Sequence, residues 1–168
     1  MDALATSIVK PALPAPPVVL MPAPDAPANL RKPLALIVDD DEILREVLEV
    51  TLQEEGFEVE TASDGAQALR CFRTLQPDIV ITDATMPVMD GFEFCKALRA
   101  RSTARHVPVL MLTAAQDTDS IRRAFTCGAT DFATKPLQEN LIGHRLRYLL
   151  QADRNLRELA RSESRLAN

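Results

Sequence analysis

The chain has 168 residues, enough for one domain with a full hydrophobic core and short extensions. Apolar residues make up 46% and charged residues 26%, as in ordinary globular proteins. The net charge is -5, and acidic residues outnumber basic ones between residues 33 and 149, which argues against direct nucleic-acid binding by this segment.

Residues 1–33 hold most of the twelve prolines, mixed with Ala and Val and without a helical or strand period. This composition predicts a disordered or polyproline-like segment. Pro11 interrupts any helix after Lys10, so no signal peptide is expected, and no stretch approaches the ~20 apolar residues that span a bilayer. We therefore expect a cytoplasmic protein without a membrane partner.

Two strand–helix units follow this segment. The apolar run 34–38 predicts a strand, and residues 57–62 predict a shorter one. A helix capped by Asp41 and closed by Gly56 follows the first strand, and a helix from about Asp64 follows the second. The residues expected on their inner faces are Ile43, Leu44, Val47, Leu48 and Thr51, and Ala68, Leu69, Phe72 and Leu75.

Three further units complete the pattern. Strands are expected at 78–83, at 107–112 ending in Thr113, and at 131–134. Helices are expected from Gly91, in the stretch that ends at Gly128, and from about Leu137. The inward residues predicted for the first two are Phe94, Cys95, Leu98, Ile121, Ala124 and Phe125.

Five strands alternating with five helices predict an α/β fold with a doubly wound, five-stranded parallel sheet. Functional sites in such folds lie at the carboxyl ends of the strands. The polar residues at these ends are Asp39, Asp40, Asp83, Thr113 and Lys135.

The carboxylates among these residues predict a metal site. Unit charges ~4 Å apart repel by about 4 kcal/mol at an effective dielectric constant near 20, so three converging carboxylates need a cation. The ligands are all oxygen, and neither His106 nor His144 stands at a strand end, which favours Mg2+, with Mn2+ as an alternative, over zinc or copper.

The remaining strand-end residues favour phosphoryl chemistry. Magnesium keeps open positions for water and phosphate oxygens. Lys135 offers a positive charge and Thr113 a hydroxyl donor for phosphoryl oxygens, and Asp83 is the natural nucleophile. The expected product is an aspartyl phosphate.

Residues 34–150 resemble the receiver domain of two-component response regulators. The matching motifs, in chain order, are Asp39-Asp40, Asp83 with Met86-Pro87 and Met89-Asp90-Gly91, Thr113-Ala114 and Lys135-Pro136. The resemblance implies a flavodoxin-like (βα)5 fold. It also implies that Asp83 takes its phosphoryl group from a phosphohistidine on a histidine kinase or phosphotransfer protein.

The resemblance also assigns roles to single residues. It implies that Asp40, Asp83 and the backbone carbonyl of Thr85 bind magnesium directly and that Asp39 acts largely through water. Thr113 and Phe132 are expected to move when the phosphate arrives, and the Lys135-Pro136 bond to be cis. The chain would then be a signalling switch, not an enzyme beyond the chemistry of its own Asp83.

The last helix is expected to continue beyond the domain, over residues 151–168. Leu149, Ala152, Leu156, Leu159, Glu163 and Leu166 recur at spacings of three and four. This heptad pattern predicts a homodimer or a coiled-coil connection to an output module outside this segment, although a frayed amphipathic tail fits the short pattern equally.

Three other functions share parts of this pattern. A hydrolase of the haloacid dehalogenase type needs a second Asp two residues after the nucleophile, where this chain has Thr85. A flavin-binding domain needs a strand-end loop rich in Ser, Thr and Gly, and none occurs. A stand-alone receiver that acts as an adaptor differs in its partners, not in its chemistry.

Three cysteines, Cys71, Cys95 and Cys127, are odd in number and spaced too widely for a metal knuckle or a redox pair. We expect them to be small buried apolar residues.

Overall fold

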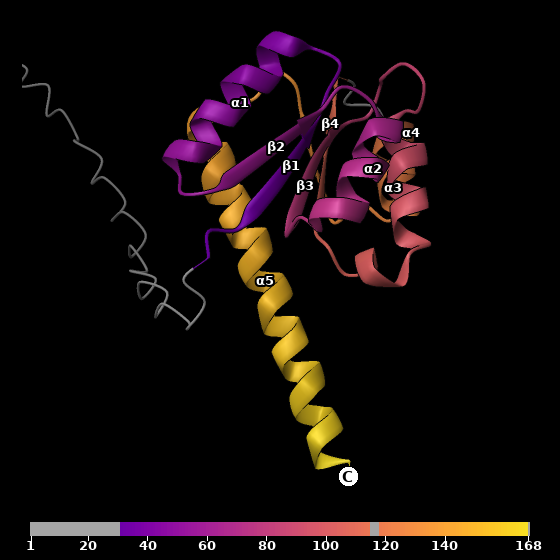
Figure 1. The fold of residues 1–168 in the computed structure, drawn as a ribbon. Helices are drawn as coiled ribbons and strands as arrows, with labels where there is room; N and C mark the ends of the chain where they lie inside the picture. Colours follow the sequence, from indigo (N-terminus) through magenta and orange to yellow (C-terminus); the bar gives the residue numbers. More distant parts are fainter. Residues whose placement is uncertain (1–30, 115–117, 168) are drawn as a thin grey trace, which may run out of the picture. The chain divides into compact units, whose positions relative to one another are not determined.

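The computed structural model describes residues 31–114 and 118–167, so most of the proline-rich segment 1–33 lies outside the described residues. Its centre is a five-stranded, all-parallel sheet with the strand order β2-β1-β3-β4-β5 (Figure 1). The strands are β1 (Leu34–Val38), β2 (Glu58–Ala62), β3 (Ile79–Asp83), β4 (Val109–Thr113) and β5 (Asp131–Thr134). The predicted doubly wound fold is thereby confirmed.

A helix follows each strand. The helices are α1 (Glu42–Glu54), α2 (Gly65–Leu75), α3 (Gly91–Arg99), α4 (Thr118–Thr126) and α5 (Glu139–Leu166), with a short 3-10 helix at Ser102–Ala104 that the sequence did not predict. Asp41, Asp64 and Asp90 cap α1, α2 and α3, each carboxylate accepting a backbone N–H bond. These caps fix where the chain turns after the first three strands.

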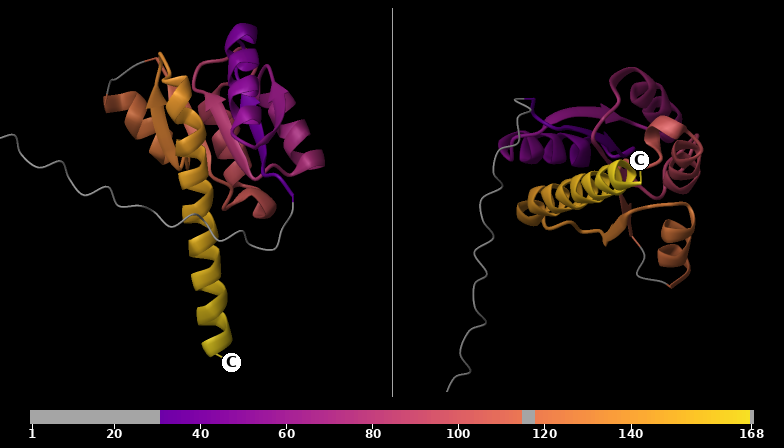
Figure 2. Two further views of the ribbon diagram at one scale, coloured as in Figure 1. Left: turned by 90° about the vertical axis from the view of Figure 1, so that its left-hand side faces the viewer. Right: turned by 90° about the horizontal axis from the view of Figure 1, so that it is seen from below.

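Helices cover both faces of the sheet (Figure 2). An apolar layer of side chains lies on each face. Helices α1 and α5 pack together over one face, around Leu48, Leu52 and Leu146. Helices α2, α3 and α4 cover the other face, around Phe72, Phe94 and Ala124. Since β1, β3 and β4 are buried between the layers, their sequences are apolar up to the polar residues at the carboxyl ends of β3 and β4.

The predicted inner faces were wrong at three residues. Ile43 is 75% exposed, because the buried stripe of α1 runs through Leu48 and Leu52 and a residue five positions before Leu48 points ~140° away from it. Phe125 is 51% exposed for the same reason, since it lies ~100° around α4 from the buried Ala124. Leu75 ends α2 and is 42% exposed.

Helix α5 has 28 residues and runs without a break past residue 150, the predicted end of the receiver domain. Leu149 and Leu150 are its last buried residues, and positions 154–167 are all exposed. Figure 1 shows this part of α5 projecting beyond the body of the domain. Among the described residues, no helix is long and apolar enough to cross a membrane.

Candidate functional site

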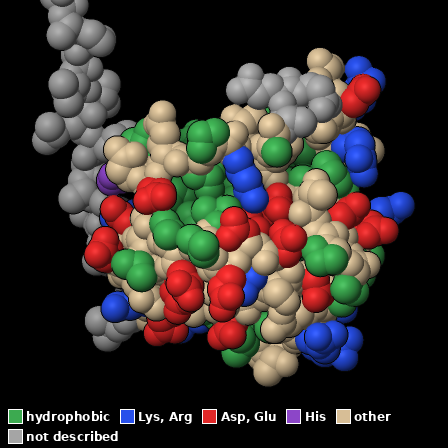
Figure 3. Space-filling view, turned by 90° about the horizontal axis from the view of Figure 1, so that it is seen from above, with side chains coloured by type: hydrophobic (Ala, Val, Ile, Leu, Met, Phe, Trp, Pro, Cys, Tyr) green, Lys and Arg blue, Asp and Glu red, His purple; other side chains and the backbone are tan. Residues whose placement is uncertain are grey.

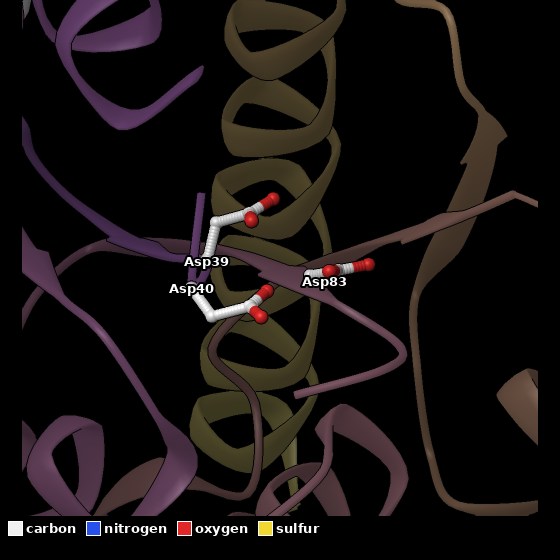
Figure 4. A group of neighbouring side chains, drawn as sticks. All are labelled: Asp39, Asp40 and Asp83. Carbon is white, nitrogen blue, oxygen red and sulfur yellow. The ribbon is translucent and has the colours of Figure 1, made fainter. Parts of the chain in front are cut away.

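Three carboxylates meet at the carboxyl edge of the sheet. Strands β1 and β3 are neighbours with Val38 opposite Thr82, so the next residues, Asp39 and Asp83, are brought side by side. Ligand atoms of Asp39, Asp40 and Asp83 all lie within 4.8 Å of one another (Figure 4). Seen from this edge, acidic side chains gather on the surface around a hollow, with basic ones among them (Figure 3).

Lys135 reaches this cluster from the end of β5. Its backbone N–H donates to the carbonyl of Thr113 at 2.9 Å, which extends the pairing of β4 and β5 by one residue. The Lys135 Nζ then lies 2.9 Å from Asp39 Oδ2 and 3.3 Å from Asp83 Oδ2. One ammonium group therefore bridges the two buried carboxylates.

The buried carboxylates differ in how they are held. Asp39 is fully buried, and its Oδ1 accepts the backbone N–H of Asp41 at 2.9 Å. Burial raises the pKa of Asp83, and the negative charge of Asp39 raises it further, against the opposing influence of Lys135 and the N–H of Thr85. Asp83 is thus a carboxylate whose charge its surroundings do not fully compensate.

Lys135 is held in its charged form. Burial lowers the pKa of Lys135, but the hydrogen bond to Asp39 and the charges of Asp83 and Asp39 outweigh it, and the net shift is upward. Its ammonium group is therefore a fixed positive charge at the site.

The donor set fits a small divalent cation. Three carboxylates face one ammonium group, which leaves two negative charges in excess. Asp40 is exposed, so the cluster is open on one side to water or to phosphate oxygens. Oxygen donors with an open side are the environment that Mg2+ prefers, and this acidic cluster could hold that ion.

The other predicted residues lie around this cluster. Thr113 ends β4 and is buried, and Thr85 is an exposed residue of the loop after β3. Phe132 lies on β5, half-buried, with its ring edge-on to that of Phe125 at 5.6 Å between centroids. The Lys135-Pro136 peptide bond is cis.

The structure adds one residue that the sequence analysis missed, Arg45, and gives a structural reason for Gly91, which the sequence analysis placed in a motif. Arg45 Nη1 donates to the backbone carbonyl of Asp39 at 2.6 Å. Gly91 N donates to the carbonyl of Ala84 at 3.0 Å, and a Cβ at position 91 would meet the carbonyl of Asp83. The Asp90-Gly91 pair signals a turn, but only the fold shows that the turn presses against the backbone of Asp83.

A sequence profile of the response regulator receiver domain matches residues 35–147. The chain belongs to this receiver domain family. It is 40% identical over 116 residues, 69% of this chain and 50% of the relative, to the DNA-binding response regulator MtrA of Mycolicibacterium smegmatis. It is 38% identical over 129 residues, 77% of this chain and 28% of the relative, to the response regulator PleD of Caulobacter vibrioides.

A solved structure shares the fold of this receiver domain. The chemotaxis response regulator CheY4 of Vibrio cholerae superposes with a TM-score of 0.68 at 37% identity, covering 71% of this chain and 99% of that one. The resemblance inferred from strand-end motifs is therefore confirmed, and the hydrolase alternative is not favoured. The receiver domain spans half or less of the curated relatives it matches.

Proposed function

We propose that this receiver domain accepts a phosphoryl group on Asp83 from a phosphohistidine of a histidine kinase or phosphotransfer protein. The observation that carries the proposal is the position of Asp83, whose carboxylate lies within reach of both the acidic cluster and the Lys135 ammonium group. Response regulators act in two-component signalling, and the chain's own catalysis is confined to loading and unloading Asp83.

The transfer forms one bond and breaks another. An oxygen of Asp83 attacks the phosphorus atom, the P–N bond of the phosphohistidine breaks, and the imidazole keeps the electron pair. Lys135 and the hydroxyl of Thr113 offset the charge on the transferred oxygens. Thr113 ends β4 and Lys135 follows β5, the strands on one side of β3, and Lys135 Nζ lies 3.3 Å from Asp83 Oδ2, which supports these roles.

Asp39, Asp40, Asp83 and the carbonyl of Thr85 would hold Mg2+ or Mn2+ at this edge of the sheet. When bound, the ion supplies positive charge that offsets the repulsion between the carboxylates and the incoming phosphoryl oxygens. Asp39 is buried and binds Lys135 directly. This contact supports the proposal that Asp39 interacts with the metal ion through water.

The proposal is tested by incubating the chain with magnesium and acetyl phosphate and measuring the intact mass. We expect the gain of one phosphate, and no gain when the divalent ion is chelated. A chain that gains none with magnesium, or gains one equally well under chelation, would contradict the proposal.

Replacing Asp40 tests the metal site separately. Asp40→Asn removes an exposed carboxylate, so we expect the free energy of unfolding to change by less than about 0.5 kcal/mol. Magnesium binding, measured by calorimetry, should weaken about tenfold or more, because a charged ligand is lost, equivalent to at least about 1.4 kcal/mol. Asp41→Asn is the matched control, since Asn caps α1 as well as Asp does. Equal magnesium affinities in the two variants would remove Asp40 from the ligand set.

We further propose that phosphorylation is read out in the cytoplasm through Thr113 and Phe132. Phe132 lies on β5, three residues before Lys135. Its ring contacts that of the exposed Phe125 on α4. A change in the position of Phe132 would therefore alter the outer surface of the domain. The output module that responds is proposed to lie outside this segment and to be reached through α5.

The projecting part of α5 supports a homodimer. The predicted heptad pattern began at Leu149, but Leu149 is buried in its own domain, so it is not available to a partner. The remaining positions form the α5 seam, defined here as Ala152, Leu156, Leu159, Glu163 and Leu166. An isolated helix of this length is marginal in water, and Leu156 and Leu159 are 67% and 59% exposed, so pairing with a second copy stabilises it.

Replacing a leucine of the α5 seam should weaken this dimer. Leu159→Glu places a charge in the apolar interface, and we expect the dimerisation constant, measured by analytical ultracentrifugation, to weaken at least tenfold. Arg161→Glu replaces an exposed residue outside the α5 seam and should change the dimerisation constant by less than about threefold. A wild-type chain that stays monomeric at every accessible concentration, with or without phosphate, would overturn the dimer.

A further inference from the structure

Cys95 on α3 and Cys127, in the turn that follows α4, belong to the same apolar layer. On α3, Phe92, Cys95 and Arg99 follow one another at spacings of three and four, so they share one face of the helix. Cys127 stands in the turn directly after α4 (Thr118–Thr126), and its backbone N–H donates to the carbonyl of Arg123 at 3.0 Å. The fold thus brings together two cysteines that are 32 positions apart in the sequence.

Two contacts bracket the cysteines. On one side, the guanidinium carbon of Arg123 lies 4.0 Å from the centre of the Phe92 ring. On the other, Arg99 Nε donates to the carbonyl of Gly128 at 2.8 Å. Between these contacts, Cys127 packs against the apolar cluster that contains Cys95, and the two thiols influence each other's protonation. The Cys127 thiol also donates to the backbone carbonyl of Ala124 at 3.0 Å.

The two thiols differ in reactivity. Cys95 is fully buried, and the interaction with the Cys127 thiol and burial raise its pKa. Cys127 is only partly buried, and the interaction with the Cys95 thiol, with smaller contributions from the backbone N–H of Ala129 and the charge of Arg99, lowers its pKa to about 7. Cys127 is therefore the more accessible and the more readily ionised of two neighbouring thiols, the arrangement typical of redox-sensitive sites.

We propose that Cys95 and Cys127 form a reversible intramolecular disulfide when the protein meets hydrogen peroxide. The thiolate of Cys127 attacks one peroxide oxygen, the O–O bond breaks, and Cys127 becomes a sulfenic acid while the other oxygen leaves as water after protonation. Cys95 gives up its proton, its sulfur attacks the Cys127 sulfur, and the sulfenic oxygen leaves as a second water. Two thiols are oxidised and one peroxide is reduced. A dithiol reductant reverses the bridge.

Cys71 provides an internal control. Burial raises the pKa of Cys71, and the negative charge of Glu60 raises it further, so its thiol stays protonated. It lies on α2 and belongs to the same apolar layer, but it has no thiol beside it among the described residues.

The test is peroxide treatment of the full reduced chain, followed by denaturation, alkylation of free thiols and peptide mass mapping. We expect a Cys95–Cys127 linked peptide to form at least tenfold faster than Cys71 is oxidised, and dithiothreitol to restore three alkylated cysteines. Three free thiols after excess peroxide, or a bridge that involves Cys71 or a second chain, would overturn the proposal.

Variants assign the order of the steps. In Cys127→Ser, we expect Cys95 to remain reduced, because its thiol is buried. In Cys95→Ala, a sulfenic acid should persist on Cys127 and be trapped by dimedone. Oxidation of Cys95 in the absence of Cys127 would contradict this order, and mapping of the unsubstituted chain decides the proposal even if a variant fails to fold.

Discussion

Asp83→Asn is expected to abolish the gain of phosphate from acetyl phosphate and magnesium while leaving the protein folded. An amide oxygen carries no charge and is a poor nucleophile, so no stable phosphoryl adduct forms at position 83. Intact mass measures the loss, which should be complete. Asp119→Asn, which removes an exposed carboxylate on α4, is the control and should gain phosphate like the unsubstituted chain.

The same variant should not lose stability in the absence of magnesium. Burial and Asp39 raise the pKa of Asp83, so the folded state binds the proton more tightly than the unfolded state. The free energy of unfolding consequently falls as the pH rises from the ordinary carboxyl range through the raised pKa. A neutral Asn removes this penalty, and Lys135 keeps Asp39 as its partner. Urea unfolding at pH 7 measures the comparison. If Asp83→Asn is folded and still gains phosphate, Asp83 is not the acceptor.

Gly91→Ala is expected to destabilise the domain by about 3 kcal/mol or more and to impair phosphorylation as well. A Cβ at position 91 would collide with the backbone carbonyl oxygen of Asp83 and lie 2.9 Å from its carbonyl carbon and 3.0 Å from the Cα of Ala84. Backbone at the end of a central strand cannot move aside without breaking the pairing of β3. Urea unfolding measures the stability change.

Gly143→Ala is the matched control for Gly91→Ala. A Cβ at position 143 would also meet a close neighbour, but that neighbour is the flexible side chain of Glu55 on the adjoining α1 segment. Alanine is also more favourable than glycine in the interior of a helix such as α5, by up to about 1 kcal/mol. We expect a change within about 1 kcal/mol. Equal losses in the two variants would show that the close approach to Asp83 is not what makes Gly91 necessary.

The sheet and the charged centre of the site could be predicted from the sequence. Buried parallel strands read as short apolar runs, and each run ends in a polar residue. Parallel strands align their carboxyl ends, so Asp39, Asp83 and Lys135 had to meet once the strand order was known. The contacts of Lys135 Nζ with both carboxylates follow from that register.

Contacts between helices could not be predicted in the same way. Spacing along the sequence gave no reason to pair Cys95 with Cys127, because their approach depends on how α3 and α4 pack on the sheet. The exposure of Ile43 and Phe125 could not be predicted either, because the apolar period of a helix indicates which side is buried but not how wide the buried stripe is. The burial of Leu149, which shortens the α5 seam, likewise depends on where α1 lies.

The unbroken length of α5 has a mechanical consequence. The helix starts four residues after Lys135, and its 28 residues extend over about 42 Å at 1.5 Å per residue. Each degree of tilt at its base would therefore sweep the far tip through about 0.7 Å. Under the proposed function, even a small tilt of α5 on phosphorylation of Asp83 would therefore displace a module attached at its far end by an amount set by this length.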